Sequence, residues 1–353
     1  MASGTVNTVV FTVSASGSPV PTYQWRRDGV NVTGQTTSNY VLTNASDAQA
    51  GSFTCFVSNG IGPGIESAAA VLSFVPTTNP GRLINLSILT ALGSGEAMTI
   101  GTVLGGAGTS GSKALLTRGA GPSLAQFGVT GVLPDPQMSL VAAATGSTVA
   151  SNEDWGGAPA LSAVFGQVGA FAYAASTSKD AAIFQPALSP GSYTVKLNDA
   201  GTGAGSVIAE IYDATPGSAF VAATPRLINV SVLKQIGTGA TLTAGFVIGG
   251  ATAKTVLVRA IGPGLAQFGL TGTMPDPQLR LFNASSVKIA ENDNWGGDAQ
   301  LTTVGTSVGA FALGSATSRD AVLLLTLAPG NYSAQVSGLG GGGSALVEVY
   351  EVP

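Results

Sequence analysis

Apolar and polar residues alternate along much of this chain in short runs that Gly, Pro and Asn separate. Such runs include residues 255–260 (TVLVRA), 331–336 (NYSAQV) and 345–350 (ALVEVY). Alternation with a period of two predicts β-strands with one buried face, and the separating residues predict turns. No segment requires a helix, although residues 265–269 (LAQFG) and their counterpart 124–128 are expected to form one short turn. We therefore predict an all-β protein.

The larger part of the chain consists of two copies of one sequence. RLINLSILTALGSGEAMTIGTVLGG begins at Arg82 and RLINVSVLKQIGTGATLTAGFVIGG begins at Arg226, and residues 118–137 agree with 259–278 at 14 of 20 positions. Each copy is too long for a solenoid repeat and has the size of an independent domain. The sequence thus predicts three separate β-sandwich domains in tandem. Their expected bounds are 1–78, 79–217 and 218–353.

The first domain has turn residues at short intervals between alternating runs, a pattern typical of a sandwich. Residues 4–75 resemble an immunoglobulin domain of the I-set kind. Trp25 matches the buried Trp of strand C, Asp47 and Gly51 match the turn before strand F, and Cys55 matches the second cysteine.

Two positions depart from that pattern. Val13 stands where the first cysteine is expected and Phe53 stands where the corner tyrosine is expected, while Cys55 is the single cysteine of the chain. No intramolecular disulfide can therefore form, and packing alone must hold this core. We expect Cys55 to be a buried structural residue.

The second half of each copy carries a further resemblance. Residues 276–298 (DPQLRLFNASSVKIAENDNWGGD), 318–338 (SRDAVLLLTLAPGNYSAQVSG) and the LVEVY strand resemble the bacterial pre-peptidase C-terminal type of β-sandwich module. The duplicated copies are also similar to RLxNxS modules of large secreted proteins from Verrucomicrobia-like bacteria. These resemblances imply a secreted module and say little about a ligand.

Composition excludes several classes of function. The chain has 50 Gly, 9% charged residues, a net charge of −4 and no His. Without His, the Ser-His-Asp triad and the usual zinc and copper sites are excluded. Basic residues are scattered singly and no apolar run is long enough to cross a bilayer, so we expect no nucleic-acid partner and no membrane insertion. The start lacks a signal peptide, which is typical of a processed or cloned fragment.

Two arginines at the ends of apolar strands are expected to need a partner. Arg118 and Arg259 each precede a glycine-rich loop, and Asp135 and Asp276 follow in PDP turns. We predict that each arginine forms a buried ion pair with the Asp of its own copy, which would hold the LAQFG loop to the sandwich. The alternative is an exposed arginine that binds a ligand.

Two similar loops, SNEDWGGA (151–158) and ENDNWGGD (291–298), are candidate metal sites. Oxygen donors without His or Cys favour calcium, and some pre-peptidase modules bind it. The loops lack EF-hand spacing. In the alternative, Asn and Asp cap their own turn while the Trp packs on the sandwich. The candidate ligands are Asn152, Glu153, Asp154, Asp180, Asn292, Asp293, Asn294 and Asp320.

The remaining motifs have structural interpretations. The glycine pairs in VLGGAG and VIGGAT lack the GK[ST] ending of a phosphate loop and predict turns. NxS/T triplets occur at Asn85, Asn229, Asn283 and Asn331. Asn85 and Asn229 lie at matching places in predicted strands, so we interpret both as structural.

These observations favour a non-catalytic extracellular or cell-surface segment: a spacer, an adhesion module or an accessory part of a larger secreted protein. Its partner would be a polysaccharide, another cell-surface polymer, or itself in an assembly. One alternative is a subunit of an extracellular filament or surface layer, whose edge strands pair from chain to chain. The other is a carbohydrate-active enzyme that uses carboxylates.

Overall fold

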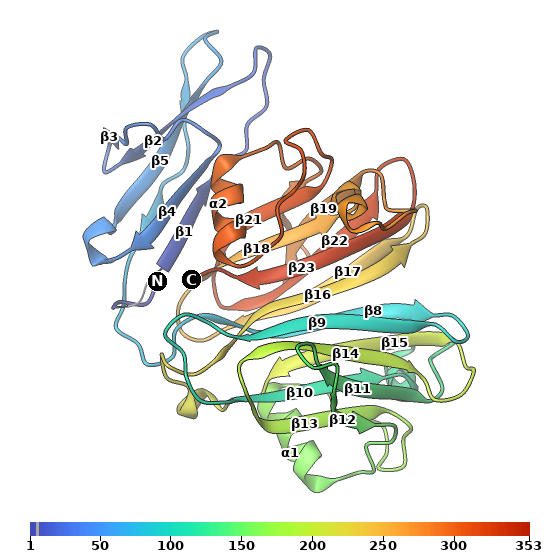
Figure 1. Cartoon of the computed structure of the whole chain (residues 1–353). Helices are drawn as coiled ribbons and strands as arrows, with labels where there is room; N and C mark the ends of the chain where they lie inside the picture. The colour runs from blue at the N-terminus through green and yellow to red at the C-terminus, as the bar shows by residue number, and fades with distance from the viewer. Residues whose placement is uncertain (5–6) are drawn as a thin grey trace.

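The computed structural model of the chain describes residues 1–4 and 7–353, and strands dominate it (Figure 1). The prediction of an all-β protein built from sandwiches is confirmed. A small N-terminal sandwich is followed by a much larger double-layered body. The two ends of the chain lie side by side, where the amide of Thr8 donates to the carbonyl of Pro353 at 2.8 Å.

The N-terminal domain contains two small antiparallel sheets, one of β1 and β4 and one in the order β3-β2-β5-β6, with β7 also paired to β5. A 3-10 turn over Asp47–Gln49 precedes β5. The strands are β1 (Asn7–Thr12), β2 (Thr22–Arg27), β3 (Val30–Asn31), β4 (Asn39–Ala45), β5 (Gly51–Ser58), β6 (Ile65–Glu66) and β7 (Ala70–Leu72).

Aromatic packing takes the place of a disulfide in this domain. Cys55 is fully buried as a free thiol, as expected. Phe11 stacks on Phe53 with ring centroids 4.2 Å apart, while Val13 is partly buried at the margin of the core. Trp25 lies beneath them, and its indole N–H donates to a backbone carbonyl at 2.9 Å, so its polar group is satisfied.

Each copy contributes eight strands and one helix to the large body. In the first copy these are β8 (Arg82–Leu92), β9 (Ala97–Gly105), β10 (Lys113–Ala120), β11 (Pro136–Ala142), β12 (Thr148–Asn152), α1 (Pro159–Val168), β13 (Ala181–Leu188), β14 (Gly191–Asp199) and β15 (Gly205–Asp213). In the second they are β16 (Arg226–Ile236), β17 (Thr241–Gly249), β18 (Lys254–Ile261), β19 (Pro277–Asn283), β20 (Lys288–Asn292), α2 (Ala299–Ser307), β21 (Ala321–Leu327), β22 (Gly330–Gly338) and β23 (Gly343–Glu351).

The two copies share both of their sheets, which differs from the separate units that the sequence predicts. One sheet has the order β13-β10-β15-β8-β17-β22-β19-β20 and the other β12-β11-β14-β9-β16-β23-β18-β21. The first strand of each copy therefore pairs with the second strand of the other, at β8·β17 and β16·β9. This pairing removes two exposed strand edges from each copy. The expected bounds of the domains themselves stay predictions.

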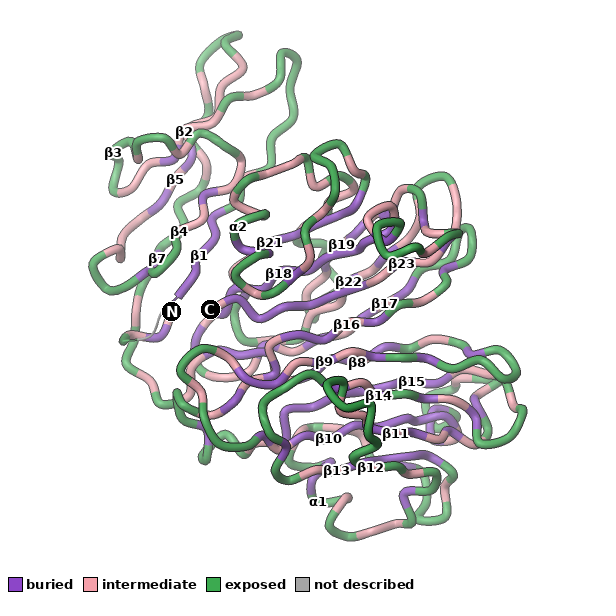
Figure 2. The backbone as a smooth tube through the Cα atoms, in the orientation of Figure 1, coloured by how far each residue is buried: buried purple, intermediate pink, exposed green. Residues whose placement is uncertain are grey.

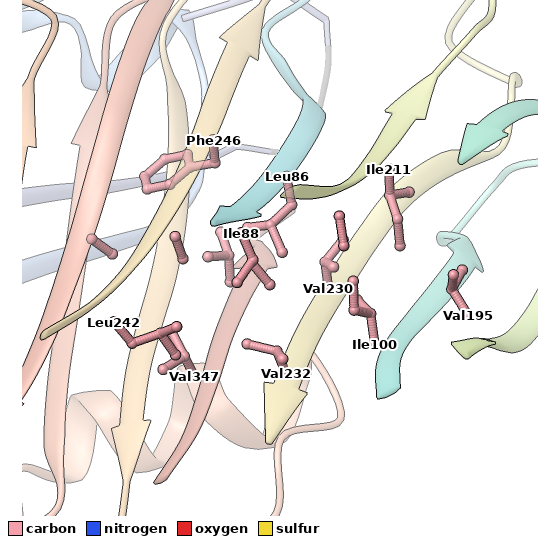
Figure 3. Packing of buried hydrophobic residues seen from close by; sticks show 14 of the residues in the cluster. Leu86, Ile88, Ile100, Val195, Ile211, Val230, Val232, Leu242, Phe246 and Val347 are labelled. Atoms are coloured by element: carbon pink, nitrogen blue, oxygen red, sulfur yellow. The ribbon is translucent and has the colours of Figure 1, made fainter. Parts of the chain in front are cut away.

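One hydrophobic core runs through this junction. Figure 3 shows Leu86 of the first copy next to Phe246 of the second, and Ile100 of the first copy next to Val230 of the second. In Figure 2 the buried residues continue along the central strands from one copy into the other. Burial of apolar surface across the junction therefore stabilises both copies together.

Serine and glycine face each other at the centre of both junctions. Ser87 lies opposite Gly245 in one sheet and Ser231 lies opposite Gly101 in the other. A Cβ added at either glycine would lie 2.8 Å from the serine Oγ. Each glycine therefore leaves the space that the serine side chain on the neighbouring strand occupies.

The two helices correct the prediction that no helix is needed. In α1, Leu161, Val164, Phe165 and Val168 recur with helical spacing, and they pack on the outer face of a sheet. The helix ends at Gly169, whose φ of +73° suits glycine. The expected LAQFG turns are confirmed as part of 3-10 helices over Pro122–Phe127 and Pro263–Phe268.

The N-terminal domain docks on the second copy. The amide of Val10 in β1 donates to Thr326 Oγ1 at 2.8 Å, and the amide of Val41 in β4 donates to Gln300 Oε1 at 2.9 Å. The Val10 side chain is buried in an apolar cluster with Leu257. The free edge of β1 is thus satisfied by the second copy.

Candidate functional site

The two Trp-Gly-Gly loops are fixed by hydrogen bonds within their own turns. Asn152 Oδ1 accepts from the amide of Ala182 at 2.8 Å, and its Nδ2 donates to the carbonyl of Asp154 at 2.9 Å. Asn292 makes the equivalent bonds to Val322 and Asn294. Both asparagines therefore connect the loop to the following strand.

Asp180 and Asp320 are fully buried acceptors. Asp320 Oδ1 accepts from the amide of Gly262 at 2.8 Å, and its carboxylate also accepts from the amide of Gly264 at 3.1 Å. Asp180 accepts from the amides of Gly121 and Ser123 in the same way. These N–H donors satisfy the buried carboxylates, so both carboxylates hold the 3-10 turn against the sandwich.

The other candidate ligands lie apart from these buried carboxylates. Glu153 and Asp154 are exposed, and Asp154 forms an ion pair with Lys179 at 3.3 Å. Asp293 is half-buried and Asn294 is exposed. In the described residues 1–4 and 7–353, no three His, Cys, Asp or Glu side chains gather in a group able to hold a metal. This geometry favours turn capping, and the calcium hypothesis stays a prediction.

Trp155 and Trp295 anchor the loops to the sheet. Each indole N–H donates to a backbone carbonyl twenty residues later, that of Ala175 at 3.1 Å and that of Ser315 at 3.0 Å. Trp155 is 8% exposed, whereas Trp295 is only half-buried. The two loops thus make the same hydrogen bond, but Trp155 is more deeply buried than Trp295.

The buried arginines pair with glutamates, which corrects the predicted Asp partners. Arg118 Nη1 lies 3.3 Å from Glu210, and Arg259 Nε lies 2.8 Å from Glu348. Each pair faces across adjacent strands in direct register. Asp135 and Asp276 instead pair with Lys179 and Arg319 near the surface. The pairs are buried as expected, but strand register rather than sequence proximity selects the partner.

Burial dominates the electrostatics of these pairs. Desolvation raises the pKa of Glu210 and Glu348, and the neighbouring arginine lowers it only in part. Desolvation also raises the pKa of Tyr350, whose hydroxyl donates to Glu348 at 2.8 Å. The raised pKa values belong to buried groups packed in the core, which indicates a structural role here.

An open groove of about 900 Å³ lies between the N-terminal domain and the second copy. Its lining mixes aromatic, amide and charged groups of both signs. The side chains that give it this character are Tyr23, Asn39, Lys288, Glu291, Asn294, Trp295 and Asp298. Such a surface offers stacking and hydrogen bonding together.

The first copy cannot form the same groove, because the residues that receive the N-terminal domain are changed there. Pro186 stands where the second copy has Thr326, and Ala160 stands where it has Gln300. Neither can give the side-chain hydrogen bonds that Val10 and Val41 use. These two differences between the copies are visible in the sequence. Their role in docking the N-terminal domain can be seen only in the structure.

Comparisons with known proteins identify only the first domain. Residues 3–59 match the family model of the immunoglobulin domain, so this domain is immunoglobulin-like. No curated protein matches the chain. Among solved structures, the chain is similar to the M60 catalytic domain with the CBM51-1 and CBM51-2 domains of Clostridium perfringens ZmpB, at 8% identity and a TM-score of 0.17.

That likeness covers 99% of this chain and 55% of the other, so the chain spans about half the length of ZmpB in that structure. A TM-score this low supports no conclusion about fold or ligand. The comparisons give no support to the resemblance to pre-peptidase modules or to proteins of Verrucomicrobia-like bacteria. In the part of the chain that the structure describes, no helix has the length and apolar character needed to span a bilayer.

Proposed function

We propose that this chain is a non-catalytic, extracellular or cell-surface binding segment, and that the groove between its N-terminal domain and second copy binds a polysaccharide. The observation that carries the proposal is the groove itself, which is about 900 Å³ in volume and open to solvent. The two parts that form it are joined by hydrogen bonds and by buried apolar contacts. Its shape is therefore fixed before a ligand arrives.

The groove has the chemistry that an uncharged sugar polymer needs. The half-buried ring of Trp295 offers an apolar face, while Asn294 and Asn39 offer amide groups. Lys288 and Glu291 neutralise each other at 2.6 Å and Asp298 adds a negative charge, so the lining has no excess of positive charge that would favour a polyanion. A polymer with many hydroxyl groups suits this mixture better than nucleic acid does.

The arrangement of carboxylates supports a binding role over catalysis. Glycoside hydrolysis needs two carboxyl groups that face each other across the sugar. Glu291 is paired with Lys288, and Asp298 accepts from the amide of Gln300 as the N-cap of α2. Neither is arranged as the second member of such a pair.

Binding of the purified chain to an array of cell-wall polysaccharides tests the proposal. Asn294→Ala in the groove should weaken binding to a retained glycan by about tenfold, as expected when a hydrogen bond is lost. Asp154→Ala, at the same place in the first copy, is the matched control and should bind like the parent chain. Binding to no polysaccharide, or equal loss in both variants, would contradict the proposal.

A further inference from the structure

The space beside the buried arginine differs between the two copies. From Trp155 to Asp180 the first copy aligns without a gap to Trp295 to Asp320 in the second. In this segment Gly305 stands where the first copy has Phe165, and Leu313 stands where it has Tyr173. Two rings have therefore been exchanged for smaller, non-aromatic residues.

In the first copy, aromatic rings surround the guanidinium. Arg118 Cζ lies 4.3 Å from the ring centroid of Phe165 and 4.4 Å from those of Phe171 and Tyr173. Trp155 also packs against Phe165 and Tyr173, at 5.8 and 5.4 Å between centroids. Cation–π attraction and ring packing together stabilise this cluster.

In the second copy the same place is a cavity. A pocket of about 50 Å³ is lined by Arg259, Trp295, Phe311 and the Gly305 turn of α2. Arg259 keeps Phe311 at 4.3 Å, and Trp295 makes no ring contact among the residues that the structure describes. Nη2 of Arg259, whose side chain is 4% exposed, has no hydrogen-bond partner in that same part of the chain. The pocket is thus walled by aromatic rings and by a guanidinium that is paired with Glu348 through Nε, and the Nη2 donor of that guanidinium is unused.

We propose that this pocket binds a small aromatic molecule that carries an oxygen acceptor, that is, a phenol. The ring would take the position of Phe165 in the first copy, between the guanidinium and the indole. Its oxygen would accept from Arg259 Nη2, a donor whose burial without a partner is costly. This inference does not depend on polysaccharide binding, because the pocket and the groove share only part of their lining.

The chain provides its own probe for the test. Its indole N–H groups belong to Trp25, Trp155 and Trp295, and only Trp295 lines the pocket. Titration with p-cresol, followed by the NMR signals of these groups, should shift the Trp295 signal with a dissociation constant of about 0.1–1 mM, a range suited to so small a ligand. Toluene, which lacks the acceptor, should bind about tenfold more weakly.

Two variants close the pocket by restoring the first copy. Gly305→Phe and Leu313→Tyr should each weaken p-cresol binding by at least about tenfold, because the ring space is filled. Gly305 lies inside α2, and a Cβ there meets only the Ala310 Cβ at 3.9 Å, so the helix has room for the first atom of a side chain that points toward the pocket. A melting temperature equal to that of the parent chain would confirm that each variant is folded.

Three results would overturn the proposal. The first is no shift of the Trp295 signal up to saturating p-cresol. The second is equal affinity in the parent chain and in both filled variants. The third is toluene binding as tightly as p-cresol, which would remove the role of Arg259. A chain that binds no polysaccharide but still binds p-cresol would contradict the proposed function and leave the phenol pocket supported. The two proposals can therefore fail separately.

Discussion

The buried ion pairs show how a residue's neighbours are set by strand register. Arg118 and Asp135 are close in sequence, yet the partner of Arg118 is Glu210, which lies directly opposite it on β15. The sequence predicted a buried pair because each arginine ends an apolar strand. It could not identify the partner, because that depends on which strands are adjacent. Glu348 on β23 repeats the arrangement with Arg259.

Breaking one pair from one side should be costly. Arg259→Met leaves Glu348 buried with only Tyr350 as a donor, and the expected loss in free energy of unfolding is about 3–5 kcal/mol. Urea unfolding measures it. The double variant Arg259→Met/Glu348→Leu removes both charges and should recover most of the loss. A single variant as stable as the parent would contradict the assigned pair.

The raised pKa of Glu348 should appear in the pH dependence of stability. Because burial raises this pKa above the ordinary value of 4.5, the folded state keeps a proton that the unfolded state has lost. The resulting stabilisation is fully present below about pH 4.5 and is lost as pH rises through the raised pKa. Glu348→Gln should lose less stability than the parent between pH 4 and 7 in urea unfolding. Parallel pH profiles of the two proteins would rule this out.

At the scale of elements, strands follow from alternation but α1 and α2 do not. Both helices have no more than ten residues and contain several Gly, Ala, Ser or Thr, so the helical spacing of their few apolar residues covers only two turns among many strand patterns. They form because the sheet beneath them buries Val164 and Val304. The Trp-Gly-Gly loops were recognised as a repeated feature. Asp180 and Asp320, the buried acids that follow these loops in the sequence, accept hydrogen bonds from the start of the 3-10 turn that contains LAQF. Each of these contacts joins residues more than fifty positions apart.

Removal of a buried acceptor should weaken the second copy. Asp320→Ala leaves the amides of Gly262 and Gly264 without their acceptor, and each unsatisfied buried group costs about 1–3 kcal/mol. Asp154→Ala removes only an exposed pair and should change stability by less than about 1 kcal/mol. Thermal unfolding compares them. Equal effects would contradict the assigned role of Asp320.

The same unfolding experiment examines calcium. Because N–H and serine hydroxyl donors already occupy the oxygens of Asp180 and Asp320, millimolar calcium should leave the melting temperature of the parent chain unchanged relative to excess chelator. A bound ion at about 100 times its dissociation constant would add about 2.7 kcal/mol. A clear rise in melting temperature would restore the metal hypothesis for these loops.

At the scale of the whole molecule, the two copies and the N-terminal domain form one packed body. The duplication is evident in the sequence, but the pairing of β8 with β17 of the second copy, on the side of β8 opposite to β15, is not. A free edge of β8 and an edge paired with β17 satisfy the same alternation of apolar and polar residues, so the pattern cannot distinguish them. The docking of the N-terminal domain through Thr326 and Gln300 was equally hidden, since it joins segments far apart in the sequence.

Cysteine cross-linking across the shared sheets measures whether strands of the two copies are neighbours in solution. Ser87 lies opposite Gly245 and Ser231 lies opposite Gly101, and in each pair a Cβ on the glycine would lie 2.8 Å from the serine Oγ. The double variants Ser87→Cys/Gly245→Cys and Ser231→Cys/Gly101→Cys place two thiols at that contact. Cys55 is fully buried and can be left in place.

Both double variants should form an intramolecular disulfide under mild oxidation, detected by mass spectrometry after alkylation. The mismatched control Ser87→Cys/Gly101→Cys, whose residues lie in different sheets, should stay reduced. Free thiols in both matched variants, or cross-links only between chains, would show that the copies are separate units and would contradict the shared sandwich.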